Sequence, residues 1–332
     1  MTSQKKTILS GMRPTGKLHI GHLLGVLNNW VALQDEYNCY FEVADWHALT
    51  SEFANTKAMA GNVKEMVIDW LSAGLDPEKS TMFVQSRVLE HAELHLLLSM
   101  ITPLPWLERC PTYKEQISEI KDKDLSNYGF LGYPVLQAAD ILLYKASVVP
   151  IGQDQLPHLE LTREICRRFN NIYGKVFPEP MHLFTKVPKL LGTDGRKMSK
   201  SYNNSVFISD SKDEYTKKIK SAFTDPLKMR KNDPGHPDGC PIFMLQNIYN
   251  VEKIAEIRKD CESGTLGCVD CKKMFLEKYE KAIAPVQEKR AGVTAKKGYV
   301  EEVLRAGTKK ADAEAKKNMA EVREAIFGKN YV

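Results

Sequence analysis

Short apolar segments typical of β-strands alternate with amphipathic helical segments along the first half of the chain. Two strands joined through a helix lie parallel, because a parallel pair needs a long crossover connection. The alternation therefore predicts an α/β fold with a parallel sheet. The expected strands are 6–11, 37–49, 80–86 and 146–152, and the expected helices are 23–33, 59–75, 91–101, 133–145 and 154–174.

The second half of the sequence is helical in its periodicity. The composition changes at a loop rich in Gly, Ser, Lys and Asn (189–204), and almost no strand signal follows it. A chain of 332 residues with 43% hydrophobic residues is long and apolar enough for two cores. We therefore expect one domain over 1–204 and a second over 205–332, with a last helix around 308–327 that packs on either of them.

Charge and cysteine content narrow the class of protein. The net charge of the chain is +5. Residues 1–211 have a net charge of −1, and residues 212–332 have a net charge of +6. This surplus fits a polyanionic partner, and a solvated helical face explains it equally well. No apolar run approaches a membrane span and no signal-peptide core opens the sequence, so we expect a cytoplasmic protein without a membrane partner. Seven cysteines in that setting favour reduced thiols or a metal site.

The tetrapeptide His19-Ile20-Gly21-His22 begins the helix that follows the first strand. In a parallel sheet this position binds phosphates, because the free N–H groups and the positive end of the helix attract anions. Gly21 permits a close approach, and the imidazoles supply hydrogen-bond donors. Two histidines three residues apart also suit a metal ion or simple packing. The two commonest nucleotide-binding glycine loops, by contrast, are absent from the sequence.

A second motif, Lys197-Met198-Ser199-Lys200-Ser201, follows about 175 residues later in the 189–204 loop. Together the two motifs resemble those of the class I aminoacyl-tRNA synthetases. The resemblance implies a Rossmann-type catalytic domain over 1–204 and an all-helical anticodon-binding domain over 205–332. It also implies the reaction: an amino-acid carboxylate attacks the α-phosphorus of ATP, pyrophosphate leaves, and the aminoacyl group passes to the tRNA 3′ end.

The resemblance assigns an ATP site to both motifs and to the end of a later strand. His19, His22, Lys197 and Lys200 are the expected catalytic residues, which hold the phosphates from two sides while Mg²⁺ binds the leaving pyrophosphate. Asp154 is expected to accept hydrogen bonds from the ribose, and it is also placed to cap a helix. The expected ATP-binding residues are Gly11, Arg13, Pro14, Thr15, Gly21, His22, Gly152, Gln153, Asp154, Leu190, Lys197, Met198, Ser199, Lys200 and Ser201.

Five segments, two of which contain these motifs, make the bacterial tryptophanyl-tRNA synthetases the most similar branch: SGMRPTGKLHIGH, ADWHALT, YPVLQAADIL, ELTRE and GRKMSKS. This implies L-tryptophan, ATP and tRNA(Trp) as substrates, a homodimer, and Asp140 as the acceptor of the indole N–H. The tyrosyl enzymes are the alternative, because a carboxylate also accepts a phenol O–H. Leu9 favours tryptophan, since tyrosyl relatives carry a tyrosine there. The expected tryptophan-binding residues are Leu9, Ala44, His47, Tyr133, Gln137, Asp140, Val149 and Ile151.

Four cysteines in the helical half, Cys240, Cys261, Cys268 and Cys271, have the spacing of a thiolate metal site, for which iron–sulfur and zinc are the candidates. A branch of the tryptophanyl family has a [4Fe–4S] cluster with nearly this arrangement, although the gap after Cys240 is shorter here. The resemblance thus implies a [4Fe–4S] cluster, with Zn²⁺ as the alternative. It would lie beside basic residues that meet the tRNA anticodon, expected at Lys228, Arg230, Lys231, Lys272 and Lys273.

Other histidines and cysteines are expected to be structural. The HAELH segment at 91–95 has no glutamate next to its first histidine, as a zinc-protease motif would, so a helical surface or core explains it better. Cys39, Cys110 and Cys166 are expected to be isolated thiols. A catalytically quiet iron–sulfur RNA-binding protein remains a third functional hypothesis, which the intact pair of motifs disfavours.

Overall fold

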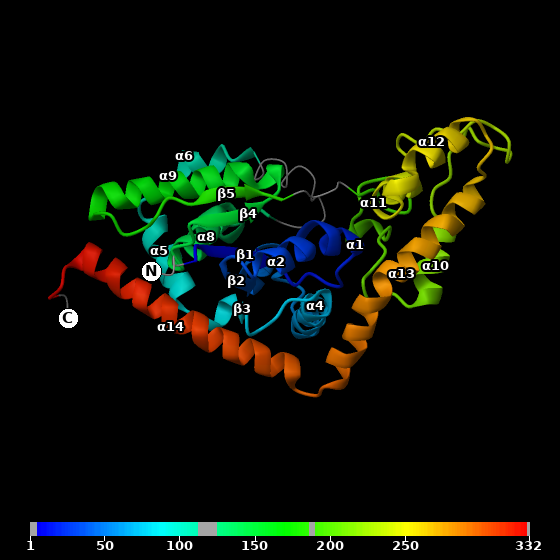
Figure 1. The fold of residues 1–332 in the computed structure, drawn as a ribbon. Helices are drawn as coiled ribbons and strands as arrows, with labels where there is room; N and C mark the ends of the chain where they lie inside the picture. Colours follow the sequence, from blue (N-terminus) through cyan, green and yellow to red (C-terminus); the bar gives the residue numbers. More distant parts are fainter. Residues whose placement is uncertain (1–4, 112–124, 186–189, 331–332) are drawn as a thin grey trace.

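The computed structural model describes residues 5–111, 125–185 and 190–330. Its centre is a sheet of five parallel strands in the order β3-β2-β1-β4-β5 (Figure 1). This confirms the predicted α/β fold with a parallel sheet. The strands are β1 Thr7–Met12, β2 Asn38–Val43, β3 Ser80–Val84, β4 Val148–Ile151 and β5 Met181–Phe184.

Helices cover both faces of the sheet because successive strand residues point to opposite sides. Ile8 and Phe41 belong to one buried apolar cluster with Trp30 and Trp70, whereas their neighbours Leu9 and Tyr40 belong to a second cluster. The helices of this part are α1 Ile20–His22, a π-helical segment Leu23–Leu27, α2 Asn28–Leu33, α3 Asp45–Glu52, α4 Met59–Ala73, α5 Glu90–Ser99, α6 Leu104–Glu108, α8 Tyr128–Leu143 and α9 Leu156–Tyr173, with 3-10 turns at Gln85–Arg87 and Gln153–Gln155.

The expected strand at 37–49 is too long. β2 ends at Val43 and α3 begins at Asp45, because polar side chains satisfy the free N–H groups of that helix start. The Asp45 Oδ1 and Gln85 Oε1 atoms each accept the N–H of Trp46, at 3.1 Å. The apolar residues after Val43 therefore pack from a helix rather than from a strand.

Beyond residue 205 the described part of the chain contains helices, a 3-10 turn and one isolated bridge at Phe207, but no strand. This agrees with the predicted helical character. The elements are α10 Lys212–Lys220, α11 Pro241–Tyr249, a 3-10 turn Val251–Lys253, α12 Ile254–Glu262, α13 Cys268–Ala295 and α14 Tyr299–Phe327, preceded by a 3-10 turn at Lys200–Tyr202.

The last two helices form a corner that returns the chain to the sheet (Figure 1). α13 is joined to α4 by Arg290, whose Nε atom lies 2.9 Å from the buried Asp69 carboxylate. α14 then runs along the edge strand β3, where Gly307 packs so closely that an added Cβ would lie 1.8 Å from the Met82 carbonyl oxygen. No helix in the described ranges is long and apolar enough to span a membrane.

Candidate active site

A pocket of about 430 Å³ lies at the carboxyl ends of β1, β2 and β4, where doubly wound sheets bind their ligands. Gly11, Arg13 and Gly152, which were expected to bind ATP, contribute to its lining. All eight side chains that the sequence analysis expected around tryptophan also line it: Leu9, Ala44, His47, Tyr133, Gln137, Asp140, Val149 and Ile151. The pocket therefore contains the expected tryptophan site and three of the fifteen expected ATP residues, whereas the four expected catalytic residues, His19, His22, Lys197 and Lys200, are not part of its lining.

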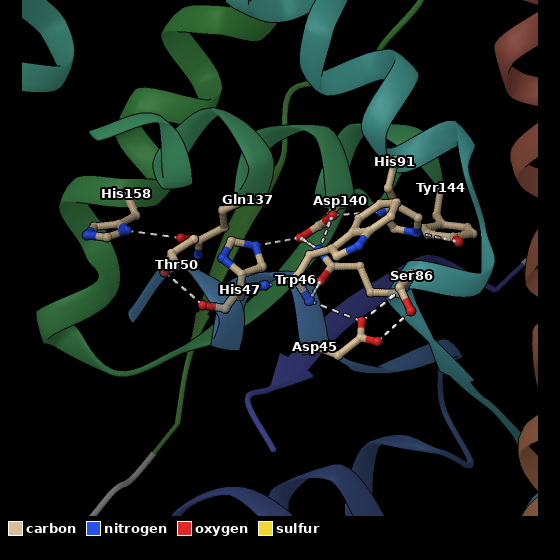
Figure 2. Close-up of polar contacts among 11 residues, drawn as sticks. Asp45, Trp46, His47, Thr50, Ser86, His91, Gln137, Asp140, Tyr144 and His158 are labelled. Atoms are coloured by element: carbon tan, nitrogen blue, oxygen red, sulfur yellow. Dashed lines mark hydrogen bonds and ion pairs between the residues drawn. The ribbon is translucent and has the colours of Figure 1, made fainter. Parts of the chain in front are cut away.

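Asp140 lies at the buried end of this pocket, 1% exposed and surrounded by hydrogen-bond donors (Figure 2). Its Oδ2 atom is 2.8 Å from His47 Nε2, and its Oδ1 atom is 2.6 Å from His91 Nδ1. Gln85 Nε2 donates to both oxygens at 2.9 Å. Burial alone would raise the pKa of Asp140, but the hydrogen bonds from His47 and His91 hold it well below its usual range. Asp140 is thus a fixed carboxylate.

Sequence reasoning placed His91 in a helical surface or core and missed its function. It is buried as that reasoning allowed, but it holds Asp140 with one ring nitrogen while its Nε2 atom pairs with the Tyr144 hydroxyl at 2.9 Å (Figure 2). Gln85 and Glu42 were also missed. The signal for Glu42 was present in the sequence, since it is the one charged residue within the strand NCYFEV.

A second polar group lines the opposite wall. The Tyr133 hydroxyl lies 2.9 Å from His158 Nε2, and His158 Nδ1 lies 2.9 Å from Gln137 Oε1. Burial lowers the pKa of His158 to about 4, with His47 contributing, so this imidazole is neutral at physiological pH. Because the sequence gives no spacing signal for His158, its link to Gln137 becomes visible only in the structure.

His19 and His22 organise the start of α1 through their own backbone. His19 Nδ1 accepts the N–H of Gly21 at 3.1 Å, and His22 Nδ1 accepts the N–H of His19 at 3.2 Å. Position 21 excludes a side chain, because a Cβ there would lie 2.8 Å from the His19 ring. Burial, together with nearby Lys200, lowers the pKa of His19 to about 4, and burial lowers that of His22 well below its usual value. Each neutral ring therefore carries its proton on Nε2.

Lys200 comes from the second motif and reaches the first. Its Nζ atom donates to the Gly16 carbonyl at 3.0 Å. The segment after the motif pairs with the segment before α1, since Ile20 N–H donates to Val206 O and Ile208 N–H to Leu18 O, both at 2.9 Å. Burial and neighbouring Arg13 lower the pKa of Lys200 to about 8. The two motifs, far apart in sequence, thus lie side by side.

The rest of the second motif is held by Asn204, whose Oδ1 accepts the Ser199 N–H at 2.8 Å and whose Nδ2 donates to the Lys197 carbonyl. The Lys197 side chain is exposed. Met198 is buried and its N–H donates to Leu190 O at 2.9 Å. The Ser201 side chain lies outside the part of the chain that the structure describes, as does the whole of residue 189.

The remaining expected ATP residues lie in two turns. Pro14 is buried, and Thr15 follows with its N–H 2.8 Å from Arg13 O. Gln153 and Asp154 are exposed in the 3-10 turn that precedes α9. The expectation that Asp154 caps the helix is wrong: α9 begins at Leu156, with Gln155 at the cap position and no side-chain capping bond. The Asp154 carboxylate is therefore left for another role.

The four cysteines of the helical half, Cys240 included, line a single small cavity between α11, α12 and α13. No three of the four Sγ atoms lie within 4.8 Å of one another. Tetrahedral Zn²⁺ with Zn–S bonds of about 2.3 Å would place its sulfurs about 3.8 Å apart. Cys39, Cys110 and Cys166 are buried, and burial raises the pKa of Cys39 to about 12 and that of Cys166 to about 11.

Two of the five lysine and arginine residues expected to meet an anticodon are in the interior. Lys272 is 7% exposed, and its Nζ donates to the carbonyls of Lys220 and Ala222 at 2.9 and 2.7 Å. Lys228 is equally buried and donates to the Asp233 carbonyl. Both line the cysteine cavity, so the expectation of an RNA contact is wrong for them. Arg230, Lys231 and Lys273 are exposed.

Comparison with known proteins gives a consistent result. Residues 1–284 match the family model described as tRNA synthetases class I (W and Y). The tryptophan–tRNA ligase of Thermotoga maritima is 52% identical over 322 residues, covering 96% of this chain and 98% of that protein. That of Aquifex aeolicus is 46% identical, covering 96% and 99%. The tryptophanyl-tRNA synthetase of Campylobacter jejuni, solved with ADP and tryptophan, has a TM-score of 0.85 at 33% identity, covering 96% and 99%.

Proposed function

The chain belongs to the class I tRNA synthetases for tryptophan and tyrosine, and we propose that it joins L-tryptophan to tRNA(Trp) with the use of ATP. It is an enzyme with the activity of a tryptophan–tRNA ligase. The observation that carries the proposal is the meeting of Lys200 with the Gly16–His22 segment beside a pocket that ends at Asp140. Arg13, whose charge acts on Lys200, lines this pocket, so the proposed phosphate site lies next to the pocket whose end would accept the indole N–H.

The end of the pocket favours indole over phenol. Leu9 is 3% exposed and lines the pocket, and it has no polar atom for a tyrosine hydroxyl. Indole offers one donor and no acceptor on its ring, which suits a fixed carboxylate such as Asp140. The apolar part of the ring would lie against Leu9, Val149 and Ile151.

The phosphate site works through fixed donors rather than through acid–base chemistry. The neutral imidazoles of His19 and His22 present Nε2–H groups, and Lys200 supplies a cation close to them. These groups stabilise the negative charge that grows on the pyrophosphate as the tryptophan carboxylate attacks the α-phosphorus. Mg²⁺, when bound with ATP, would add positive charge on the leaving pyrophosphate. Lys197 and the exposed Asp154 carboxylate complete the proposed contacts to phosphate and ribose.

Amino-acid-dependent exchange of pyrophosphate into ATP tests this proposal directly. We expect exchange with tryptophan and not with tyrosine, followed by charging of tRNA(Trp). His19→Ala and His22→Ala should each slow exchange while tryptophan binding without ATP persists. Exchange with tyrosine alone would replace the proposal by the tyrosyl alternative, and binding of tRNA without any exchange would favour a catalytically quiet protein.

We also propose a [4Fe–4S] cluster held by Cys240, Cys261, Cys268 and Cys271. Four thiols that face one cavity, spaced more widely than tetrahedral zinc requires, support this cluster over zinc. Lys228 and Lys272 line the same cavity, where their two positive charges would offset part of the charge of four thiolates. The cluster would tie α11, α12 and α13 together. Metal and sulfide analysis of anaerobically purified protein should give iron and sulfide; one zinc and no sulfide would refute it.

The division into a catalytic domain over 1–204 and an anticodon-binding domain over 205–332 belongs to the same proposal, with α14 packed back on the first. Exposed Arg230, Lys231 and Lys273 beside the cysteine cavity are the proposed RNA contacts. A homodimer is supported by exposed apolar side chains around α5, α6 and the start of α8: Leu89, Leu96, Met100, Leu104 and Tyr128. Sedimentation should give twice the chain mass, and Met100→Glu should lower it.

A further inference from the structure

Glu42 is a buried acid in the pocket wall to which none of the roles above applies. It lies next to the last residue of β2, is 3% exposed, and lines the same pocket as Asp140. Gly11 is its direct partner on β1, and a Cβ at position 11 would lie 2.6 Å from Glu42 Cγ. The carboxyl group of Glu42 thus lies across the neighbouring strand in space that only glycine leaves.

Glu42 and Asp140 are too close for two independent charges. A carboxylate oxygen of each and a ring nitrogen of His91 all lie within 4.8 Å of one another. Both side chains are buried, and two carboxylates at such a distance in a buried site do not both ionise. One proton must therefore reside on this pair of side chains.

The hydrogen bonds decide which acid carries the proton. Asp140 accepts four N–H contacts from His47, His91 and Gln85, which reach both of its oxygens and favour its charged form. Glu42 Oε2 is buried and has no partner in the described residues. The N–H donors of the site therefore stabilise the charged form of Asp140, and the proton resides on Glu42.

The other groups around Glu42 agree with this assignment. It is faced by Asp140 of α8, by Tyr144 directly after α8, by His91 of α5 and by Asp45 of α3. Burial, then Asp140, then Asp45 raise the pKa of Glu42 well above its usual value. Among the described residues that line the pocket the only permanent cation is Arg13.

We propose that Glu42 is a positioning residue for tryptophan recognition: as a neutral acid it donates its O–H toward Asp140 and keeps a single negative charge, on Asp140, at the end of the pocket. The inference rests on the proposed function. Its consequence is that the indole N–H meets one fixed carboxylate rather than a pair that exchanges a proton. An ionised Glu42 would instead place a second, unpaired charge against the aromatic ring.

Infrared difference spectroscopy tests where the proton is. The wild-type minus Glu42→Gln spectrum at neutral pH should show the carbonyl band of a protonated carboxylic acid, and that band should shift when tryptophan binds. A carboxylate band in its place would overturn the assignment. Asp140→Asn should convert the Glu42 band to that of a carboxylate, because the negative charge that opposes ionisation of Glu42 is then gone.

Kinetics test the positioning role with Glu42→Gln, which remains a neutral donor, and Glu42→Leu, which does not. The readout is the preference for tryptophan over its isostere with sulfur in place of the indole nitrogen. Glu42→Gln should keep this preference, whereas Glu42→Leu should lower it about tenfold with the KM for ATP unchanged. Glu90→Leu is the matched control, since Glu90 is a second buried acid with an unpaired Oε2 in the described residues and lies outside the pocket lining.

The outcomes separate the two proposals. A folded Glu42→Leu protein, verified by its melting curve, with the wild-type preference would overturn the role of Glu42 and leave the proposed function intact. A wild-type protein without tryptophan-dependent exchange would overturn the proposed function itself, whereas the infrared result would still report the protonation of Glu42.

Discussion

Deprotonation of Lys200 should weaken the binding of ATP in the first step of the reaction at alkaline pH. Burial and Arg13 lower the pKa of its ammonium to about 8, whereas an exposed lysine titrates near 10.4. If ATP binds the protonated form, the apparent KM for ATP is multiplied by one plus the ratio of deprotonated to protonated Lys200. For a pKa of about 8 this factor is about 1.1 at pH 7 and about 11 at pH 9. The KM for ATP should therefore rise about tenfold across this range.

The assay is pyrophosphate exchange from pH 7 to 9.5 with saturating tryptophan and varied ATP. Lys200→Arg should abolish the rise, because a guanidinium keeps its proton throughout. Lys200→Met should raise the KM for ATP at every pH. Lys197→Arg is the control and should retain the wild-type rise, since the Lys197 side chain is exposed. A Lys200→Arg enzyme that shows the same rise as the wild type would refute the reasoning.

Three further predictions concern other parts of the structure. Asp140→Asn should raise the KM for tryptophan roughly 10- to 100-fold, because a charged acceptor is lost; an unchanged KM in the exchange assay would contradict this. Gly21→Ala should slow exchange, since its Cβ would lie 2.8 Å from the His19 ring; wild-type rates would show that the ring position is unimportant. Burial raises the pKa of Asp69 to about 6 despite Arg290, so its contribution to folding stability is complete below about pH 4 and is lost as the pH rises through about 6. Asp69→Asn should remove that slope from urea unfolding measured over pH 4 to 7, and an unchanged slope would assign it to other groups.

The sequence was sufficient for the parts of the site that depend on strand ends and local motifs. Leu9 and Gly11 lie in β1, and Gly152 directly follows β4. Because the strands could be predicted, the place of these residues in the pocket could be expected. The donors around Asp140 could not, because His91 and Gln85 come from segments whose spacing to Asp140 follows no pattern. The packing of α5 on α8 brings His91 to Asp140, and the 3-10 turn after β3 brings Gln85.

The direction in which a side chain points was the second feature that the sequence could not predict. Lys272 follows Cys271 at the start of α13 and looks in sequence like any basic surface residue. Its direction depends on which turn of α13 faces the 220–224 segment, and that contact brings the ammonium to two backbone carbonyls. The start of a helix was equally hard to place. α9 begins two residues later than expected, at Leu156, so Asp154 is not at its N-cap.

The return of α14 to the sheet affects how the protein can be made. β3 is an edge strand, and its outer backbone lies against Gly307 of α14. This helix covers the strand but is translated more than 200 residues later. During synthesis the rim of the nucleotide-binding half therefore stays bare until 299–327 has emerged from the ribosome. A chain that stops after α13 would retain every residue proposed for catalysis, but the edge of its β3 would be exposed and could pair with other copies of the chain. A nonsense mutation there should therefore produce aggregates rather than a shorter active enzyme.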